Sequence, residues 1–143
     1  MLKALRLILV PCLLAVWSLP AYAQSESTDE AQKAAESWLA LVDEGKYGES
    51  WDEAAAFFKK QLPKQKWEGM LNQVRAPLGK TQSRKLKGAK YTTELPNAPK
   101  GEYVLIQYET SFETADSTVE TITPMKQEDG SWRVSGYLIR PTG

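Results

Sequence analysis

The stretch VLIQYETSF occupies residues 104–112. Val104, Ile106, Tyr108 and Phe112 stand at even-numbered positions, and Leu105, Gln107, Glu109 and Ser111 stand between them. Because successive side chains of a β-strand point to opposite faces, this two-residue repeat predicts a strand with one buried face. The C-terminal half of the chain is therefore expected to form a sheet.

The pattern continues on both sides of this strand. Residues 117–126 are rich in Thr and Val, and a last strand has its inward positions at Trp132, Val134, Gly136 and Leu138. Asp129-Gly130 between them is a strong hairpin signal. Residues 82–94 are a weaker strand candidate, followed by a turn-forming segment over 96–101. We therefore expect four antiparallel strands.

Before residue 80 the apolar repeat changes to three and four residues, which is typical of amphipathic helices. The first predicted helix begins at a capping box made by Ser27 and Glu30, and it ends near Gly45. Its apolar stripe consists of Ala31, Ala34, Ala35, Trp38, Leu39, Leu41 and Val42.

Two more helices are expected on either side of Pro63. One begins at Ser50, which forms a capping box with Glu53, and Pro63 ends it. Pro63 then opens the third helix, whose apolar positions are Trp67, Met70, Leu71 and Val74. Helices followed by strands predict the α+β class, with three N-terminal helices packed on one face of a curved four-stranded antiparallel sheet.

The first 23 residues have the three parts of a secretory signal peptide. Lys3 and Arg6 are followed by an apolar run to Trp17 and by the small-residue motif Ala21-Tyr22-Ala23. The run is shorter than the roughly 20 residues that a membrane span needs. We expect cleavage between Ala23 and Gln24, no stable membrane insertion afterwards, and a periplasmic or secreted domain over residues 24–143.

The absence of two residue types excludes much chemistry. The chain has no histidine, and its one cysteine, Cys12, lies in the leader. The mature domain therefore lacks histidine-dependent triads, cysteine nucleophiles and metal sites with nitrogen or sulfur ligands. It also has no glycine-rich phosphate loop, so we assign no catalytic residue, metal or cofactor.

The expected mature domain is close to neutral. Removing Lys3 and Arg6 leaves 16 of 18 basic residues against 18 acidic ones. Nucleic acid is not an expected partner of a near-neutral exported domain.

Aromatic side chains on the predicted inward faces define a candidate pocket. Trp38, Trp51 and Trp67 lie on the apolar stripes of the three helices. A ligand pocket also requires a few polar groups. The candidate pocket residues are Trp38, Trp51, Trp67, Arg75, Gln107, Tyr108 and Tyr137. The alternative is that the aromatic rings simply fill the core.

Short motifs spread along the chain resemble a known exported family. They are Trp38-Leu39, Asp43-x-Gly45-x-Tyr47, Ser50-Trp51, Ala54-Ala55, Arg75-x-Pro77-Leu78-Gly79, Gly101-Glu102-Tyr103, Thr110-Ser111-Phe112, Glu120-Thr121 and Asp129-Gly130-x-Trp132-Arg133-Val134-x-Gly136-Tyr137. In this order they resemble the exported domain of unknown function 4019 family, which has no established biochemical role. The order of elements is similar to the cystatin-like cone of the nuclear transport factor two and ketosteroid isomerase superfamily. That cone serves enzymes, ligand carriers and assembly modules alike.

Three functional hypotheses follow. The leading one is a non-enzymatic binding or interaction module for a small molecule, held in an apolar pocket, or for an envelope protein. An alternative is a carboxylate-dependent isomerase- or hydratase-like enzyme, which requires an Asp or Glu inside the cavity. The third is a structural homodimer that pairs through Gln107, Glu109 and Ser111 on the exposed sheet face.

Overall fold

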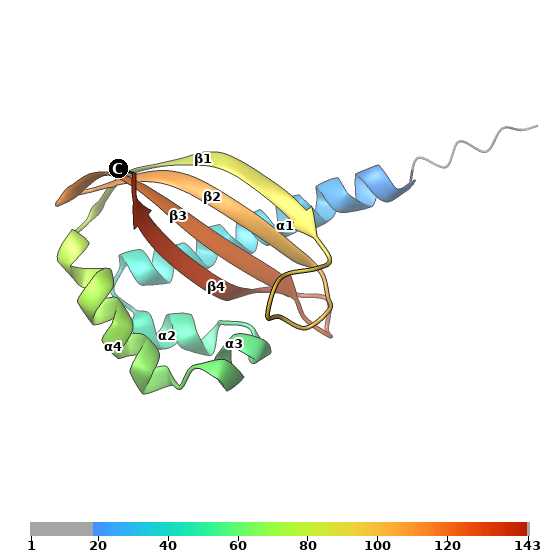
Figure 1. Cartoon of the computed structure of the whole chain (residues 1–143), viewed down its shortest axis with the longest axis horizontal. Coiled ribbons are helices and arrows are strands. Elements are labelled where there is room, and N and C mark those ends of the chain that lie inside the picture. Colours follow the sequence, from blue (N-terminus) through green and yellow to red (C-terminus); the bar gives the residue numbers. More distant parts are fainter. Residues whose placement is uncertain (1–18, 143) are drawn as a thin grey trace, which may run out of the picture.

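The computed structural model describes residues 19–142, in which helices are followed by an antiparallel sheet (Figure 1). The helices are α1 (Leu19–Asp43), α2 (Tyr47–Asp52), α3 (Ala56–Gln61) and α4 (Lys64–Val74), with a 3-10 turn η1 (Ala76–Leu78). The strands are β1 (Thr81–Thr92), β2 (Tyr103–Phe112), β3 (Ala115–Lys126) and β4 (Trp132–Pro141), and they pair in chain order. The expected α+β class and the four antiparallel strands are confirmed.

The hairpin between β3 and β4 turns at the predicted dipeptide. Gly130 has a φ of 84°, a conformation that glycine adopts without steric cost. The Gln127 amide donates to the Ser131 carbonyl oxygen at 2.7 Å, and Asp129 Oδ1 accepts from the Ser131 amide at 2.9 Å. These bonds close the turn and fix which residues begin β4.

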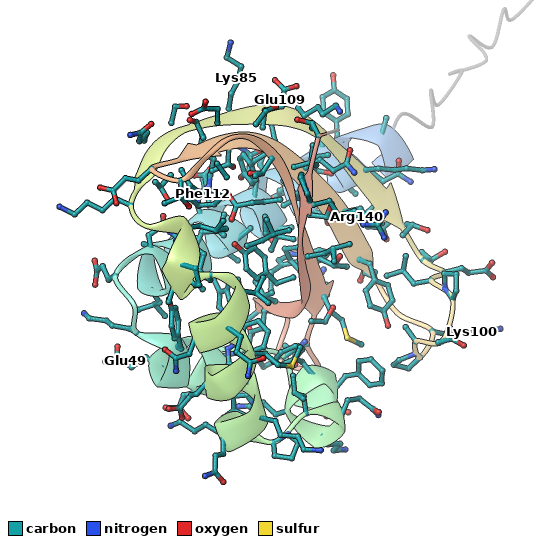
Figure 2. The ribbon with its side chains drawn as sticks, turned by 60° about the vertical axis from the view of Figure 1, so that its left-hand side comes forward. Glu49, Lys85, Lys100, Glu109, Phe112 and Arg140 are labelled. Carbon is teal, nitrogen blue, oxygen red and sulfur yellow. The ribbon has the colours of Figure 1, made fainter. Side chains whose placement is uncertain are left out.

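Helix α1 crosses the inner face of the sheet and contacts all four strands (Figure 1). Ala31, Ala35, Trp38, Leu39 and Val42 of its apolar stripe are buried, as the helical repeat predicted. The two-residue repeat of β2 is also confirmed, because its even-numbered side chains are buried. The labelled Lys85 and Glu109 stand on the outer side of the sheet (Figure 2).

The predicted start of the first helix is wrong. Helix α1 is already helical from Leu19, so Ser27 and Glu30 lie inside it and form no capping box. The Thr28 hydroxyl donates to the Gln24 carbonyl oxygen one turn earlier, at 2.8 Å. Nothing in residues 19–27 breaks a helix once it has formed, because proline is tolerated in a first turn.

The single helix predicted after Ser50 is in fact two, so the described chain has four α-helices instead of three. The break lies at Glu53–Ala55, where the Ala55 amide donates to the Val134 carbonyl oxygen of β4 at 2.8 Å. This tertiary bond replaces an intrahelical one. Ser50 lies within α2 and caps nothing, since its hydroxyl donates to the Tyr47 carbonyl oxygen.

Two of the predicted inward positions of α4 face solvent. Met70 is 48% exposed and Val74 is 53% exposed, whereas Trp67 and Leu71 are buried. The buried pair lies four residues apart on one narrow stripe, which is the part of the helix that meets the core.

A β-bulge changes the face of β4 halfway along. Thr123 pairs with Gly136 and Pro124 pairs with Val134, so Ser135 is an extra residue. Pro124 has no amide hydrogen to donate to the ladder, and proline within a sheet is typical of such bulges. Beyond the bulge Tyr137 points inward and Leu138 is 45% exposed. The predicted inward positions are therefore right for residues 132 and 134 and wrong for 136 and 138.

Most of the predicted signal peptide, residues 1–18, lies outside the described residues, and residues 19–23 form the start of α1. None of the helices within residues 19–142 combines the length and apolarity that a membrane span requires.

Ser50 joins two tryptophans of the core. Its hydroxyl accepts a hydrogen bond from Trp67 Nε1 at 2.9 Å, and its carbonyl oxygen accepts one from Trp38 Nε1 at 2.8 Å. Ser50 itself has no exposed surface. Both indole donors are therefore satisfied inside the core by one residue.

We predict that Ser50→Ala lowers the unfolding free energy by about 1–3 kcal/mol, because it leaves the Trp67 N–H buried without an acceptor. Urea denaturation measures the loss. The matched control is Ser83→Ala on the exposed part of β1, which should change stability by less than about 0.5 kcal/mol. Equal effects of the two substitutions would show that the Ser50 hydroxyl is not a buried acceptor.

Candidate functional site

Three of the predicted pocket residues pack against one another in the core. The ring centroids of Trp38 and Trp67 lie 6.0 Å apart, and those of Trp38 and Tyr137 lie 5.2 Å apart. Phe58 meets Trp67 edge-on at 5.0 Å. These separations are those of aromatic rings in contact. The space between these rings is therefore occupied by the side chains themselves.

The other four predicted residues lie around or away from this cluster. Trp51 is half-buried and donates from Nε1 to the Leu62 carbonyl oxygen at 2.7 Å. Tyr108 is buried. Burial is the main cause that raises its pKa to about 12, and the nearby Glu36 carboxylate is the second. Gln107 is exposed on the outer face of the sheet, so its prediction as an inner pocket residue is wrong. Its odd position in β2 determines that orientation.

Arg75 belongs to a charged network that the sequence did not reveal. Its side chain is buried, and its Nη2 lies 3.2 Å from Asp43 Oδ1 and 3.1 Å from Thr81 Oγ1. Its Nη1 donates to the Gly79 carbonyl oxygen at 2.6 Å. The guanidinium also stacks over Phe112, with its carbon 4.5 Å from the ring centroid.

Arg84 is the centre of this network because it bridges two carboxylates. Its Nη1 and Nη2 donate to the two Asp43 oxygens at 2.7 and 2.9 Å, and its Nε donates to Glu120 Oε1 at 2.8 Å. Glu120 has no exposed surface, and it also accepts from Thr110 Oγ1 at 2.6 Å and from the Tyr137 hydroxyl. With Arg75, two guanidinium groups balance two carboxylates.

The environment shifts the pKa values of two members. Burial acts to raise the pKa of Asp43, but the hydrogen bonds and charge of Arg84, with Thr81 and Arg75, hold it below its usual value. Burial raises the pKa of Tyr137 well above its usual value, and the Glu120 charge and hydrogen bond add to this. Asp43 is therefore a stable anion and Tyr137 a stable donor at neutral pH.

Glu120 is the residue that sequence reasoning missed. The signal was present, because residues 118, 120 and 122 alternate on the same face as the apolar positions of β2. Its oxygens accept bonds from Arg84, Thr110 and Tyr137, which come from the other three strands, and the bonds from Arg84 to Asp43 tie α1 to this group. Within residues 19–142 no group of three Asp, Glu, His or Cys side chains could hold a metal ion.

Two surface clefts meet beside the start of β4. The narrow cleft has a volume of about 230 Å³ between Ala34, Trp38 and Leu41 of α1 and residues 131–134. The wide cleft, of about 1000 Å³, lies between the α2–α3 segment and the β3–β4 hairpin. Glu53 and Arg133 line both clefts. Arg133 Nη1 lies 3.1 Å from Glu53 Oε2 and 3.3 Å from the Glu53 carbonyl oxygen.

Trp132 lines the narrow cleft and carries an unsatisfied donor. Its side chain is 7% exposed, and its Nε1 has no hydrogen-bond partner among the described residues. A buried polar group without a partner costs about 1–3 kcal/mol and is rare in folded proteins. Of the seven predicted pocket residues, Trp38 is the one that lines this cleft.

A family model described as "Protein of unknown function (DUF4019)" matches residues 34–137. The chain belongs to the DUF4019 family. Comparisons with curated proteins and with solved structures gave no match. The matched span of this DUF4019 domain contains the Arg84 network and the α1 and β4 walls of the narrow cleft. The resemblance read from the short motifs is thus confirmed for the family.

We predict that Asp43→Asn lowers stability at pH 7 and that this deficit shrinks in acid. A carboxylate whose pKa is lowered on folding stabilises the fold above its unfolded value of about 3.9, and this contribution is lost as pH falls through the folded value. Urea denaturation should therefore show a constant deficit from about pH 7 to 5 and a smaller one below about pH 4.

The matched control is Asp116→Asn in the exposed start of β3, which should show no deficit at either pH. A deficit for Asp43→Asn that is the same at pH 2.5 and pH 7 would contradict an ionised, arginine-bound Asp43.

Proposed function

We propose that this DUF4019 domain is a non-enzymatic, exported binding module that accepts a small ligand in the narrow cleft. The observation that carries the proposal is that Trp132, whose buried N–H is unpaired, lines a concave and largely apolar surface. Binding sites typically combine such apolar walls with a few polar groups. The interior aromatic cluster, by contrast, packs against itself and serves as core.

The enzyme hypothesis has less support. It requires an accessible carboxylate, and Glu120 is the buried carboxylate of the inner face. Glu120 is paired with Arg84 and bonded by Thr110 and Tyr137, and neither the narrow nor the wide cleft is lined by it. A general base needs a free lone pair within reach of the substrate proton.

The similarity to the cystatin-like cone is consistent with a binding role. A sheet that curls around one long helix, as Figure 2 shows, supports that similarity. The architecture serves carriers as well as enzymes, so it does not by itself assign chemistry.

The homodimer hypothesis would use the outer sheet face, where Gln107 and Glu109 are exposed.

The test begins with protein purified from a host that exports it. N-terminal sequencing should begin at Gln24, as expected for a cleaved leader. Fractions of envelope extract are then added and the melting temperature is measured, because a ligand that binds only the native state must raise it. We expect at least one low-molecular-mass fraction to do so.

A matched pair of α1 variants locates the effect. Ala34→Trp fills the narrow cleft and should abolish the shift in melting temperature. Ala40→Trp places the same ring at an exposed α1 position that does not line the cleft, so it should leave the shift unchanged. If no fraction shifts the wild type, or if the two variants respond alike, the proposal is wrong.

A further inference from the structure

The size and walls of the narrow cleft limit what it can hold. Its volume of about 230 Å³ lies below the roughly 300–1,000 Å³ of sites for drug-sized ligands. Trp38 and Leu41 on one side and Val134 on the other provide apolar surface. The cleft therefore suits a small molecule with an apolar body.

The charges at the cleft come from one ion pair. Among the described residues that line it, the charged ones are Glu53 and Arg133. The Glu53 side chain is 62% exposed, compared with 38% for Arg133. An exposed pair of this kind contributes little to stability, so a competing carboxylate can replace Glu53 at small cost.

The main chain keeps Arg133 at the cleft during such an exchange. Arg133 Nη1 also donates to the carbonyl oxygen of Glu53, at 3.3 Å. That bond does not depend on where the Glu53 carboxylate points. A guanidinium carries five N–H donors, and its fork matches a carboxylate. Arg133 can therefore accept a new anion without losing its position.

We propose that the narrow cleft binds a small apolar carboxylic acid, whose carboxylate displaces Glu53 from Arg133 and whose body lies between Trp38, Leu41 and Val134. This inference rests on the proposed binding function and specifies its ligand class. Glu53 acts as a built-in competitor that occupies Arg133 when the cleft is empty. The ligand class is thus set by one guanidinium beside one apolar surface.

Trp132 supplies a second hydrogen-bond donor for the ligand and an NMR signal that reports binding. Its indole N–H is covered by neighbouring atoms, so a ligand oxygen reaches it only when the ring turns. A new hydrogen bond should then move the Trp132 indole N–H resonance downfield in an NMR spectrum. Comparison with Trp132→Phe identifies this resonance.

The experiment titrates the exported full-length product with 3-phenylpropanoate and with the neutral 3-phenylpropanamide. For the acid, Arg133→Gln should weaken binding by about tenfold, the loss of one charge-assisted bond, whereas Glu53→Gln should tighten it by about threefold. Arg133→Lys should be intermediate because it keeps the charge but loses the fork. Arg140→Gln, an exposed arginine of β4 outside the cleft lining, should bind like the wild type.

Amide affinity should be the same in all these variants, and thermal unfolding confirms that each is folded. Weaker acid binding by Glu53→Gln, or unchanged binding by Arg133→Gln, overturns the proposal. If the wild type binds neither probe, but an extract fraction still raises its melting temperature and Ala34→Trp abolishes that rise, the ligand class is wrong and the binding function stands. If no fraction acts either, both proposals fail.

Discussion

Arg84 binds two carboxylates that come from different layers of the molecule. Asp43 is the last residue of α1, and Glu120 lies on the inner face of β3. Burying such charges is costly unless good geometry and further hydrogen bonds offset the loss of water. Here both Asp43 oxygens receive an Arg84 donor, and Thr110 and Tyr137 complete the shell of Glu120. The network thereby fixes the C-terminal end of α1 against the sheet.

The position of α1 in turn determines what lies beside β4. With its end held at Asp43, the helix places Ala34 and Trp38 opposite the first residues of β4. The bulge at Ser135 divides β4 into two parts that contact different regions of the molecule. Before it, Trp132 and Arg133 line the narrow cleft, and after it Tyr137 reaches both Trp38 and Glu120. One strand therefore serves the surface site and the core network together.

The sequence predicted the features that depend on local periodicity. The strand over 104–112, the apolar stripe of α1 and the Asp129-Gly130 turn follow from side-chain repeat and turn chemistry alone. The failures occur where a tertiary hydrogen bond or an irregularity intervenes. The helix after Ser50 breaks because Ala55 bonds to Val134, and the faces of β4 exchange at the bulge opposite Pro124. A single sequence does not show which distant carbonyl will accept an amide.

The candidate site was predicted only in part, for a related reason. Trp38 lies at both the core and the cleft, but Arg133 and Glu53 become neighbours only through the contact between β4 and the end of α2. Glu120 was overlooked because an ionised residue on an inward strand position is costly unless its partners are known. Those partners, Arg84 and Tyr137, come from β1 and β4, the two edge strands of the sheet.

The most direct test of this account is a double-mutant cycle on Asp43→Asn and Arg84→Met, the pair that joins α1 to the sheet, measured as unfolding free energy at pH 7. Arg84→Met should cost about 3–5 kcal/mol, because it leaves the buried Glu120 carboxylate without a cation, and Asp43→Asn should also destabilise the fold, because it removes the carboxylate that Arg84 and Arg75 share. The double variant should lose clearly less than the sum, with a coupling of about 1 kcal/mol or more. Strictly additive losses would contradict the claim that the Arg84 network holds α1 on the sheet.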